Sequence, residues 1–225
     1  MFGPDVTIVV ATYNRPQYLP VMLESIRVSA ATVPNRVRII VVDDASDTMA
    51  AKDIAHKMEA DYIRLPENQG VAGALSAGFD KVDTELYALW GDDDAFLPNW
   101  FPLHLAEIEK GYDVVAGSYW HTDSALNPKQ KVVLPVATFA NLKRGIVQCN
   151  DGSLVRRSAV GDLKLRPERK RAVMMTFWLA MAAKGVKFGV VKQPTWLYRR
   201  HDGNLSNGRS DYDNELRRQA MAEYA

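Results

Sequence analysis

The chain has 225 residues, of which 47% are hydrophobic and 24% are charged, and five are Trp. This composition can build a buried core, so it excludes a disordered segment and a small protein that depends on disulfides. The single cysteine, Cys149, excludes an intramolecular disulfide and a zinc site made of cysteines. No apolar run approaches the roughly 20 residues of a membrane span, and the first residues lack a signal-peptide pattern. We therefore expect a cytoplasmic protein.

Short apolar runs alternate with helical patterns through the first half of the chain. The pattern predicts strands at residues 7–11, 37–42, 62–65 and 86–90, and helices at 19–27, at 49–58, from about 70, and at 98–110. Strands that alternate with helices imply right-handed crossovers and a largely parallel sheet with helices on both faces.

The second half is less regular. The pattern predicts strands at residues 114–119 and 186–191, a return to the sheet within 147–157, and an apolar helix at 172–184 before Gly185. Linkers and internal repeats are missing from the sequence. We therefore expect one domain over residues 1–225, with a nucleotide-binding half at 1–119 and an acceptor-binding half at 120–225.

The formal net charge of +1 conceals two parts of opposite sign. Residues 1–139 carry 11 Lys and Arg against 19 Asp and Glu, a net charge of −8, whereas residues 140–225 carry 17 against 8, a net charge of +9. An acidic part can hold a cation, and a basic part can attract phosphate, an anionic acceptor or nucleic acid. Two solvated faces of different sign would give the same counts, so charge alone leaves both interpretations open.

Polar residues follow three of the predicted strands, at the point where each strand ends. They are residues 12–15, the pair Asp43 and Asp44, and the run at 92–94. Ligands of open parallel sheets bind beyond the carboxyl ends of the strands, so we expect these residues to line one crevice. The first strand is followed by neither a Gly-x-Gly-x-x-Gly motif nor a Gly-Lys-Ser/Thr loop, which disfavours a dinucleotide-binding fold and a P-loop enzyme.

Three consecutive aspartates, Asp92, Asp93 and Asp94, are the strongest local signal. Adjacent carboxylates repel one another unless water or a hard cation neutralises them, and oxygen ligands suit Mg²⁺ or Mn²⁺. An exposed acidic turn is the alternative interpretation. The position of this run at a strand end, beside a second pair of aspartates, favours a metal site.

Five short blocks occur in the order found in inverting family 2 glycosyltransferases, which have a GT-A fold. The blocks are residues 11–16, 41–46, 68–70, 91–94 and 198–206. The chain resembles this family over nearly its whole length. The resemblance implies a Rossmann-like α/β fold, with a mostly parallel central sheet flanked by helices in a single domain. It also implies transfer of a sugar from a UDP- or dTDP-sugar to an acceptor hydroxyl, with inversion.

By this resemblance, residues of all five blocks would bind the nucleotide-sugar. They are Thr12, Tyr13, Asn14, Arg15, Asp43, Asp44, Asn68, Gly70, Asp92 and Arg199. Asp44, rather than Asp43, would accept a hydrogen bond from an N–H of uracil or thymine, while Asp43 would cap the following turn. Tyr13 and Arg15 could alternatively belong to a structural turn.

The same resemblance assigns a divalent cation, Mn²⁺ or Mg²⁺, to a motif of the DXD type. Asp93, Asp94 and His201 would hold the cation, and Asp92 would face the ribose. The cation would act as a Lewis acid for the departing nucleoside diphosphate.

The acceptor side departs from the family pattern. Inverting members carry an acidic pair about five residues before a Trp, and one carboxylate deprotonates the acceptor hydroxyl. When Trp178 and Gly185 anchor the register, Val173 and Met174 stand at these positions, and Thr176 lies nearby. None of these three side chains can act as a general base.

Another carboxylate could replace the missing base. Asp151 is preferred because it lies in a Gly-containing turn of the acceptor half, and Asp162 and Glu168 are alternatives. Asp151 could equally be a turn-forming residue. A wrong register, an acceptor that needs no strong base, or a catalytically silent chain would also explain the departure.

A basic segment at residues 164–171 precedes the apolar helix. It predicts an anionic acceptor, such as a phosphorylated lipid carrier, an acidic glycan or modified DNA, although a solvated loop has the same composition. Basic residues would also allow peripheral contact with an anionic membrane. Two other functions remain open: a non-catalytic protein that binds nucleotide-sugars or glycans, and a nucleotidyltransferase, which the missing phosphate loop disfavours.

Overall fold

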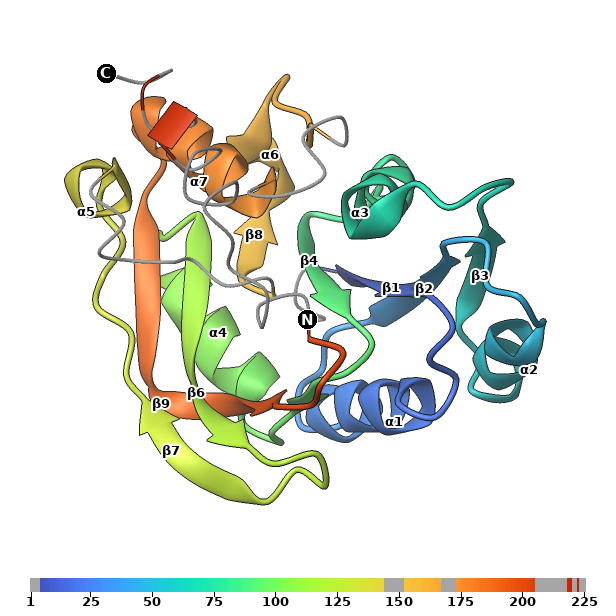
Figure 1. The fold of residues 1–225 in the computed structure, drawn as a ribbon. Coiled ribbons are helices and arrows are strands. Elements are labelled where there is room, and N and C mark those ends of the chain that lie inside the picture. The colour runs from blue at the N-terminus through green and yellow to red at the C-terminus, as the bar shows by residue number, and fades with distance from the viewer. Residues whose placement is uncertain (1–4, 144–151, 167–172, 205–217, 220–221, 223–225) are drawn as a thin grey trace.

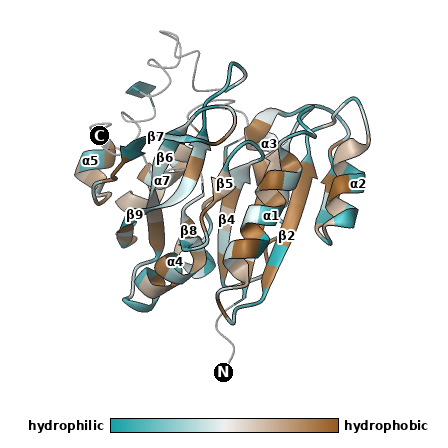
Figure 2. Ribbon diagram, turned by 90° about the horizontal axis from the view of Figure 1, so that it is seen from below, coloured by the Kyte–Doolittle hydropathy of each residue, from teal (hydrophilic) through white to brown (hydrophobic). Residues whose placement is uncertain are grey.

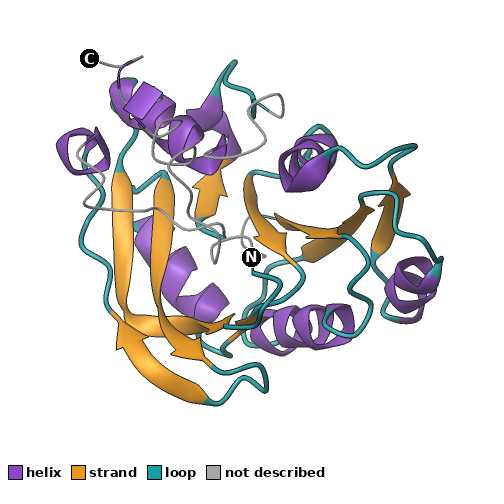
Figure 3. Ribbon diagram, viewed as in Figure 1, coloured by secondary structure: helices purple, strands orange, loops and turns teal. Residues whose placement is uncertain are grey.

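The structure is a computed structural model that describes residues 5–143, 152–166, 173–204, 218–219 and 222. A single twisted sheet runs through both halves of the chain, with helices on its two faces (Figure 1, Figure 3). In the described residues, no helix combines the length and the apolar character needed to cross a membrane.

The first half forms parallel strands joined by helices, as predicted. Its elements are β1 (Val6–Thr12), α1 (Leu19–Ala30), β2 (Val37–Asp43), α2 (Ala50–Lys57), β3 (Asp61–Arg64), α3 (Gly70–Phe79) and β4 (Leu86–Gly91). The pairs β1–β2, β1–β4 and β2–β3 are all parallel. The four strands lie within one residue of their predicted bounds, because each is a continuous apolar run with a polar stop.

The second half of the sheet, formed by the chain after β4, contains more elements than the sequence predicts. They are β5 (Ala95–Phe96), α4 (Trp100–Glu109), β6 (Val114–Thr122), β7 (Pro128–Val132), α5 (Phe139–Lys143), β8 (Leu154–Arg156), α6 (Arg157–Val160), α7 (Val173–Ala183) and β9 (Phe188–Arg199). The sequence pattern does not predict β5, β7, α5 and α6, which are short or lack an apolar pattern. It also ends the last strand at residue 191, whereas β9 continues to Arg199.

The strand order is β3-β2-β1-β4-β8-β6-β9-β5, and β7 pairs with β6. The expected parallel pairing holds from β3 to β4 and between β6 and β9, whereas β5, β7 and β8 pair antiparallel. The sheet is therefore mixed, and the short strand β8 joins its two halves.

The continuation of β9 depends on a change of register. Gly117 of β6 pairs with Val191, Ser118 with Pro194 and Tyr119 with Trp196, so two shifts leave Lys192, Gln193 and Thr195 with no opposite residue. Proline donates no hydrogen bond and is tolerated at such a bulge. After the bulge, β9 runs on to the carboxyl end of the sheet.

Alternate residues of the central strands supply two hydrophobic cores. In β1, Ile8 and Val10 contact the core on the side of α1 and α4, whereas Val9 and Ala11 contact the core on the side of α3 and α7. The hydropathy view shows apolar residues along the strands and on the helices that cover them (Figure 2). These two cores fix the sheet and leave the loops at its carboxyl edge to form a site.

Candidate functional site

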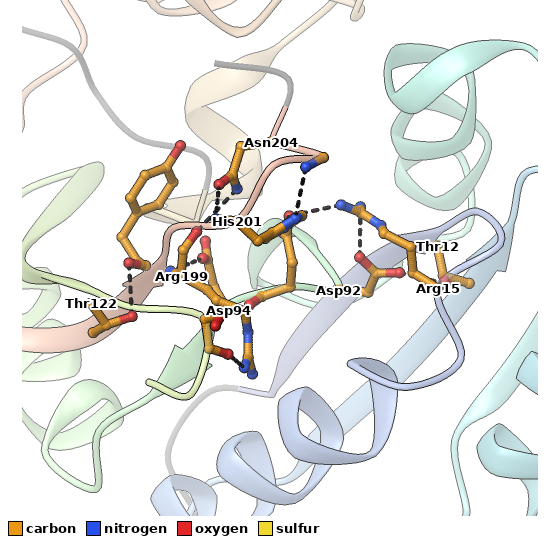
Figure 4. A network of polar contacts seen from close by, with 12 residues as sticks. Thr12, Arg15, Asp92, Asp94, Thr122, Arg199, His201 and Asn204 are labelled. Atoms are coloured by element: carbon orange, nitrogen blue, oxygen red, sulfur yellow. Dashed lines mark hydrogen bonds and ion pairs between the residues drawn. The ribbon is translucent and has the colours of Figure 1, made fainter. Parts of the chain in front are cut away.

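Three parallel strand ends bring the predicted polar residues together. Thr12 pairs with Asp43 on β2, and Ala11 pairs with Gly91 on β4. The aspartates that follow β4 therefore lie beside Thr12, at the carboxyl edge of the sheet. The loop after β9 returns to the same place (Figure 4).

Asp92 is the most enclosed of the three consecutive aspartates. It is fully buried; Thr12 Oγ1 donates to its Oδ2 at 2.6 Å, and Arg15 Nη2 lies 2.6 Å from its Oδ1. Burial raises the pKa of Asp92 to about 7, against the opposing effects of Arg15 and the Thr12 hydrogen bond. Asp92 thus depends on Thr12 and Arg15 for compensation of its charge.

Asp93 is the aspartate that connects the two halves of the protein. Its Oδ2 accepts a hydrogen bond from Arg15 Nη1 at 2.8 Å and lies 3.0 Å from His201 Nε2. His201 Nδ1 accepts a hydrogen bond from the Gly203 N–H at 3.2 Å. Because Nδ1 is an acceptor here, the neutral ring carries its proton on Nε2, where it points at Asp93.

Asp94 and Arg199 tie the aspartate turn to the end of β9. Asp94 Oδ1 accepts the Arg199 N–H at 3.0 Å. The Arg199 side chain donates from Nε to the Asp93 carbonyl at 2.6 Å and from Nη1 to the Ser124 carbonyl at 2.5 Å. Arg199 is buried, so its guanidinium holds the backbone of this turn as well as adding positive charge.

Two residues that the sequence analysis did not single out complete this part of the site. Asn204 accepts the His201 N–H at 2.6 Å and donates to the Arg199 carbonyl at 3.0 Å, which closes the loop after β9. The Tyr18 ring lies 5.0 Å from the His201 ring and 4.8 Å from the Arg199 guanidinium carbon. Asn204 falls within the last resemblance block, whereas no sequence pattern marks Tyr18.

Asp43 has a structural role at the end of β2. Its Oδ1 accepts the Ser46 N–H at 2.8 Å, and its Oδ2 accepts from Tyr62 at 2.6 Å and from Arg64 Nη1 at 3.1 Å. The expectation that Asp43 caps the following turn is therefore confirmed. Both Asp43 oxygens are engaged and its side chain is fully buried, so Asp43 fixes the backbone of the turn that contains Asp44.

Asp44 links β2 to the start of α3. Its Oδ1 accepts the Gln69 N–H at 2.7 Å, and its carbonyl accepts from Asn68 Nδ2 at 3.3 Å. Burial raises the pKa of Asp44, while the N–H groups of Gln69 and Gly70 lower it. Gly70 has a positive φ of 75°, which a residue with a side chain rarely adopts. Asn68 and Gly70 thus help to hold Asp44 in place.

Asn14 and Tyr13 lie in the loop after β1. Asn14 joins this loop to the one after β2: its N–H donates to Ser46 Oγ at 2.9 Å, and its side chain exchanges two hydrogen bonds with Asp47. Tyr13 is 42% exposed. Asn14 therefore shapes the loop, and Tyr13 presents an open aromatic face.

Asp151, Asp162 and Glu168 are the candidate general bases, and the structure describes one of them. Asp151 and Glu168 lie outside the described residues. Asp162 is exposed and lines a hollow with Phe79 and Asp80, at the end of α3 opposite to Gly70. Because α3 is about 15 Å long, this hollow lies well away from the Gly70 end of the helix, and nothing in the described residues links Asp162 to the aspartate turn.

The start of α7 supplies no alternative. Its first turn contains no acidic residue, as the sequence analysis expected. Val173 is buried, and the Thr176 hydroxyl donates to the Val173 carbonyl at 2.8 Å. The described part of the acceptor half therefore offers no carboxylate at the family position of the base.

A divalent cation fits the chemistry of the aspartate turn but not its present arrangement. Carboxylates of Asp93 and Asp94 with the His201 imidazole are suitable ligands for Mn²⁺ or Mg²⁺. However, Asp93 Oδ2 and Asp94 Oδ1 accept hydrogen bonds from protein groups. Within the described residues, no three His, Cys, Asp or Glu side chains form a ready metal cluster. A cation at Asp93 therefore requires a shift of its present partners.

The sheet and the aspartate turn define a GT-A fold. A structure of S. aureus TarS 1–349 in complex with UDP-GlcNAc superposes with a TM-score of 0.77 and 15% identity, over 97% of this chain and 66% of that chain. The mannosyltransferase PcManGT from Pyrobaculum calidifontis, in complex with GDP-Man and Mn²⁺, gives a TM-score of 0.67 and 13% identity, over 100% of this chain and 64% of that chain. At this level of identity the likeness shows the fold alone.

The sequence comparison defines the family. The model of glycosyl transferase family 2 matches residues 7–163, and this chain belongs to that family. Undecaprenyl-phosphate 4-deoxy-4-formamido-L-arabinose transferases of Proteus mirabilis and Klebsiella pneumoniae are 33% and 30% identical over 115 residues. The match covers 49% of this chain and 35% of each relative, so the chain spans about a third of the length of these proteins.

Proposed function

We propose that this chain is a glycosyltransferase that takes its sugar from a UDP- or dTDP-sugar and transfers it, with inversion, to an acceptor hydroxyl. The observation that carries the proposal is the meeting of Thr12, Arg15, Asp92, Asp93 and His201 at one edge of the sheet. These residues come from three segments that are far apart in the sequence. The names of the relatives and the UDP-GlcNAc complex of TarS support the proposal.

Asp44 is the residue proposed to select the base. It is a buried carboxylate, and an ionised carboxylate only accepts hydrogen bonds. Uracil and thymine offer a ring N–H, whereas cytosine does not, so Asp44 should discriminate against cytosine. Guanine also offers a ring N–H, and the GDP-Man complex of PcManGT makes GDP a necessary comparison.

Asp93, Asp94 and His201 are proposed to hold Mn²⁺ or Mg²⁺. When bound, the cation supplies a Lewis acid for the leaving diphosphate. The chain itself contributes orientation: Thr12 fixes Asp92, the Gly203 N–H fixes the His201 ring, and Asn204 fixes the His201 backbone. Tight positioning of this kind lowers the barrier for in-line attack of the acceptor oxygen on the anomeric carbon.

The acceptor proposed here is a phosphorylated lipid carrier whose attached sugar supplies the hydroxyl. Of the described members of the basic segment, Arg166 is exposed and can meet a phosphate, whereas Lys164 lines the hollow of Asp162 at the far end of α3. The relatives are named for transfer to undecaprenyl phosphate. An acidic glycan and modified DNA are the other anionic acceptors to compare, and an anionic membrane surface would attract the same residues.

A second candidate function is a non-catalytic protein that binds nucleotide-sugars. The first turn of α7, which contains no acidic residue, favours it. The two candidates share donor binding and differ in turnover. Release of UDP from UDP-GlcNAc that depends on an added polyprenyl diphosphate-linked glycan with free hydroxyls would exclude the second candidate. Donor binding without such release, over a panel of lipid, glycan and DNA acceptors, would exclude the first.

Calorimetric titration with UDP, dTDP, GDP and CDP in the presence of Mn²⁺ tests the donor half without an acceptor. We expect UDP and dTDP to bind more tightly than CDP, and this preference to disappear in Asp44→Ala. Asp53→Ala is the matched control, because Asp53 is an exposed carboxylate on α2 of the same half. Equal affinity for CDP and UDP in the wild type would contradict the role of Asp44.

A further inference from the structure

Arg15 lies against two carboxylates of the aspartate turn, where its positive charge neutralises them. Its Nη2 is 2.6 Å from Asp92 Oδ1, and its Nη1 is 2.8 Å from Asp93 Oδ2. One guanidinium therefore bridges two consecutive carboxylates with two of its nitrogens. The sequence resemblance assigns Arg15 to phosphate, but in this structure it neutralises the aspartates.

The bridge competes directly with a divalent cation. Asp93 Oδ2 already accepts from Arg15 and lies against His201 Nε2, so a cation that binds this oxygen has to displace Arg15. A divalent cation bound to Asp93 would also lie a few ångströms from a fixed positive charge, and like charges at such distances repel strongly in a partly buried site. A cation at Asp93 Oδ2 and the Arg15 bridge therefore compete for the same oxygen.

The Arg15 side chain can move from the two carboxylates to a phosphate group. It lies in the loop between β1 and α1, and its side chain is 27% exposed. The planar fork of arginine that spans two carboxylate oxygens can equally span two phosphate oxygens. A nucleoside diphosphate thus offers Arg15 an alternative anion next to its present one.

We infer that Arg15 is the resident counter-cation of Asp92 and Asp93, and that it makes binding of the divalent cation depend on the nucleoside diphosphate. Without a nucleotide, Arg15 holds the aspartates and excludes the cation. When a diphosphate arrives, Arg15 exchanges carboxylate oxygens for phosphate oxygens, and Asp93 becomes available. This inference rests on the proposed donor site and adds an order of events to it.

The test measures Mn²⁺ binding in the absence of nucleotide, from the electron paramagnetic resonance signal of free Mn²⁺. Wild-type protein should bind Mn²⁺ weakly, and Arg15→Gln should bind it at least about tenfold more tightly, because a nearby positive charge is removed. Arg15→Lys keeps the charge and should remain close to the wild type. Arg64→Gln is the matched control, since Arg64 is a 35%-exposed partner of Asp43 at the same sheet edge and should leave Mn²⁺ affinity unchanged.

Several outcomes would overturn the inference. One is an Arg15→Gln variant that binds Mn²⁺ no better than wild type does, and another is an equal gain in Arg15→Lys or Arg64→Gln. The wild type gives a check that does not depend on the folding of any variant: Mn²⁺ bound to the protein, after subtraction of the Mn²⁺ that UDP binds without protein, must rise when UDP is present. If wild type binds UDP with Mn²⁺ but Arg15→Gln shows no gain, only the inference fails. If wild type binds neither, the proposed function fails as well.

Discussion

The two halves of the sheet are built differently, and they contribute differently to the site. In the first half, parallel strands end at polar residues that become site residues directly, as Thr12 and Asp92 do. In the second half, β9 passes a bulge and an antiparallel pair with β5 before it reaches the aspartates. The first half thus supplies the carboxylates, and the second half delivers Arg199 and His201 to them from more than 100 residues away in the sequence.

Local sequence pattern is sufficient to place the site residues of the first half but not those of the second half. Residues at the ends of parallel strands meet because parallel register places all carboxyl ends at one edge. Residues on a mixed sheet meet only when each register shift is correct. Changes at the seam between the halves should therefore have larger effects than changes within either half.

Gly152 gives the largest expected effect, because it lies at that seam. It has a φ of 92°, and a Cβ at this position would lie 2.2 Å from the buried Trp90 ring. Gly152→Ala should lower the free energy of unfolding by about 3 kcal/mol through overpacking and strain together. Gly111→Ala is the control, since Gly111 has the same φ and nothing within 4 Å, and it should cost about 1 kcal/mol. Equal losses in urea denaturation would contradict the close contact with Trp90.

The buried His104 makes the free energy of unfolding depend on pH. It is fully buried between α4 and β6, and burial lowers its pKa to about 3 from 6.5, against the opposing Trp100 carbonyl. Below pH 6.5 the unfolded chain binds the extra proton, so this contribution to stability is complete above that pH and is lost as the pH falls toward 3. The slope is about 1.4 kcal/mol per pH unit.

His104→Asn isolates this slope, because Asn does not titrate and places a donor near the Trp100 carbonyl. The difference in unfolding free energy between wild type and variant should change by about 2 to 3 kcal/mol over about two pH units below 6.5. Other titrating groups cancel in this difference. A difference that stays constant with pH would show that His104 is not buried in its neutral form.

Thr12 makes a short hydrogen bond to a carboxylate, whereas Thr195 makes a long, weak one to a carbonyl. Both side chains are buried; Thr12 donates to Asp92 at 2.6 Å, and Thr195 donates to the Ser118 carbonyl at 3.4 Å. Thr12→Val should cost about 2 kcal/mol, since it removes a donor from a buried carboxylate. Thr195→Val should cost less than about 1 kcal/mol. Chemical denaturation of both variants measures the contrast, and a reversed order would contradict it.

Arg38 gives the smallest expected effect. Its guanidinium lies 2.7 Å from Asp61 and 3.3 Å from Asp83, but all three side chains are at least 40% exposed. Arg38→Ala should change the free energy of unfolding by less than about 1 kcal/mol, and salt should reduce even this change. A loss that persists in concentrated salt would mean that Arg38 contributes by packing.

The sequence predicted the elements and the polar strand ends of the first half, because each depends on a short run of residues. It also placed His201 and Arg199 near the aspartates, but only through resemblance to a family. It could not predict the bulge in β9, the small strands, or the partners that engage Asp43 besides the turn that it caps. Those features depend on contacts between distant segments, such as the hydrogen bond of Tyr62 to Asp43. The Arg15 bridge likewise depends on two loops that meet only after folding.

The most direct test of the account is the affinity for UDP in the presence of Mn²⁺ and again in EDTA, for wild type, Asp93→Asn and the control Asp53→Asn. The account predicts that wild type and Asp53→Asn bind UDP only with Mn²⁺, and that Asp93→Asn loses at least about tenfold in affinity, in line with the loss of one charged ligand. UDP binding that is unaffected by EDTA and by Asp93→Asn would contradict the central claim that the aspartate turn forms the metal-dependent donor site.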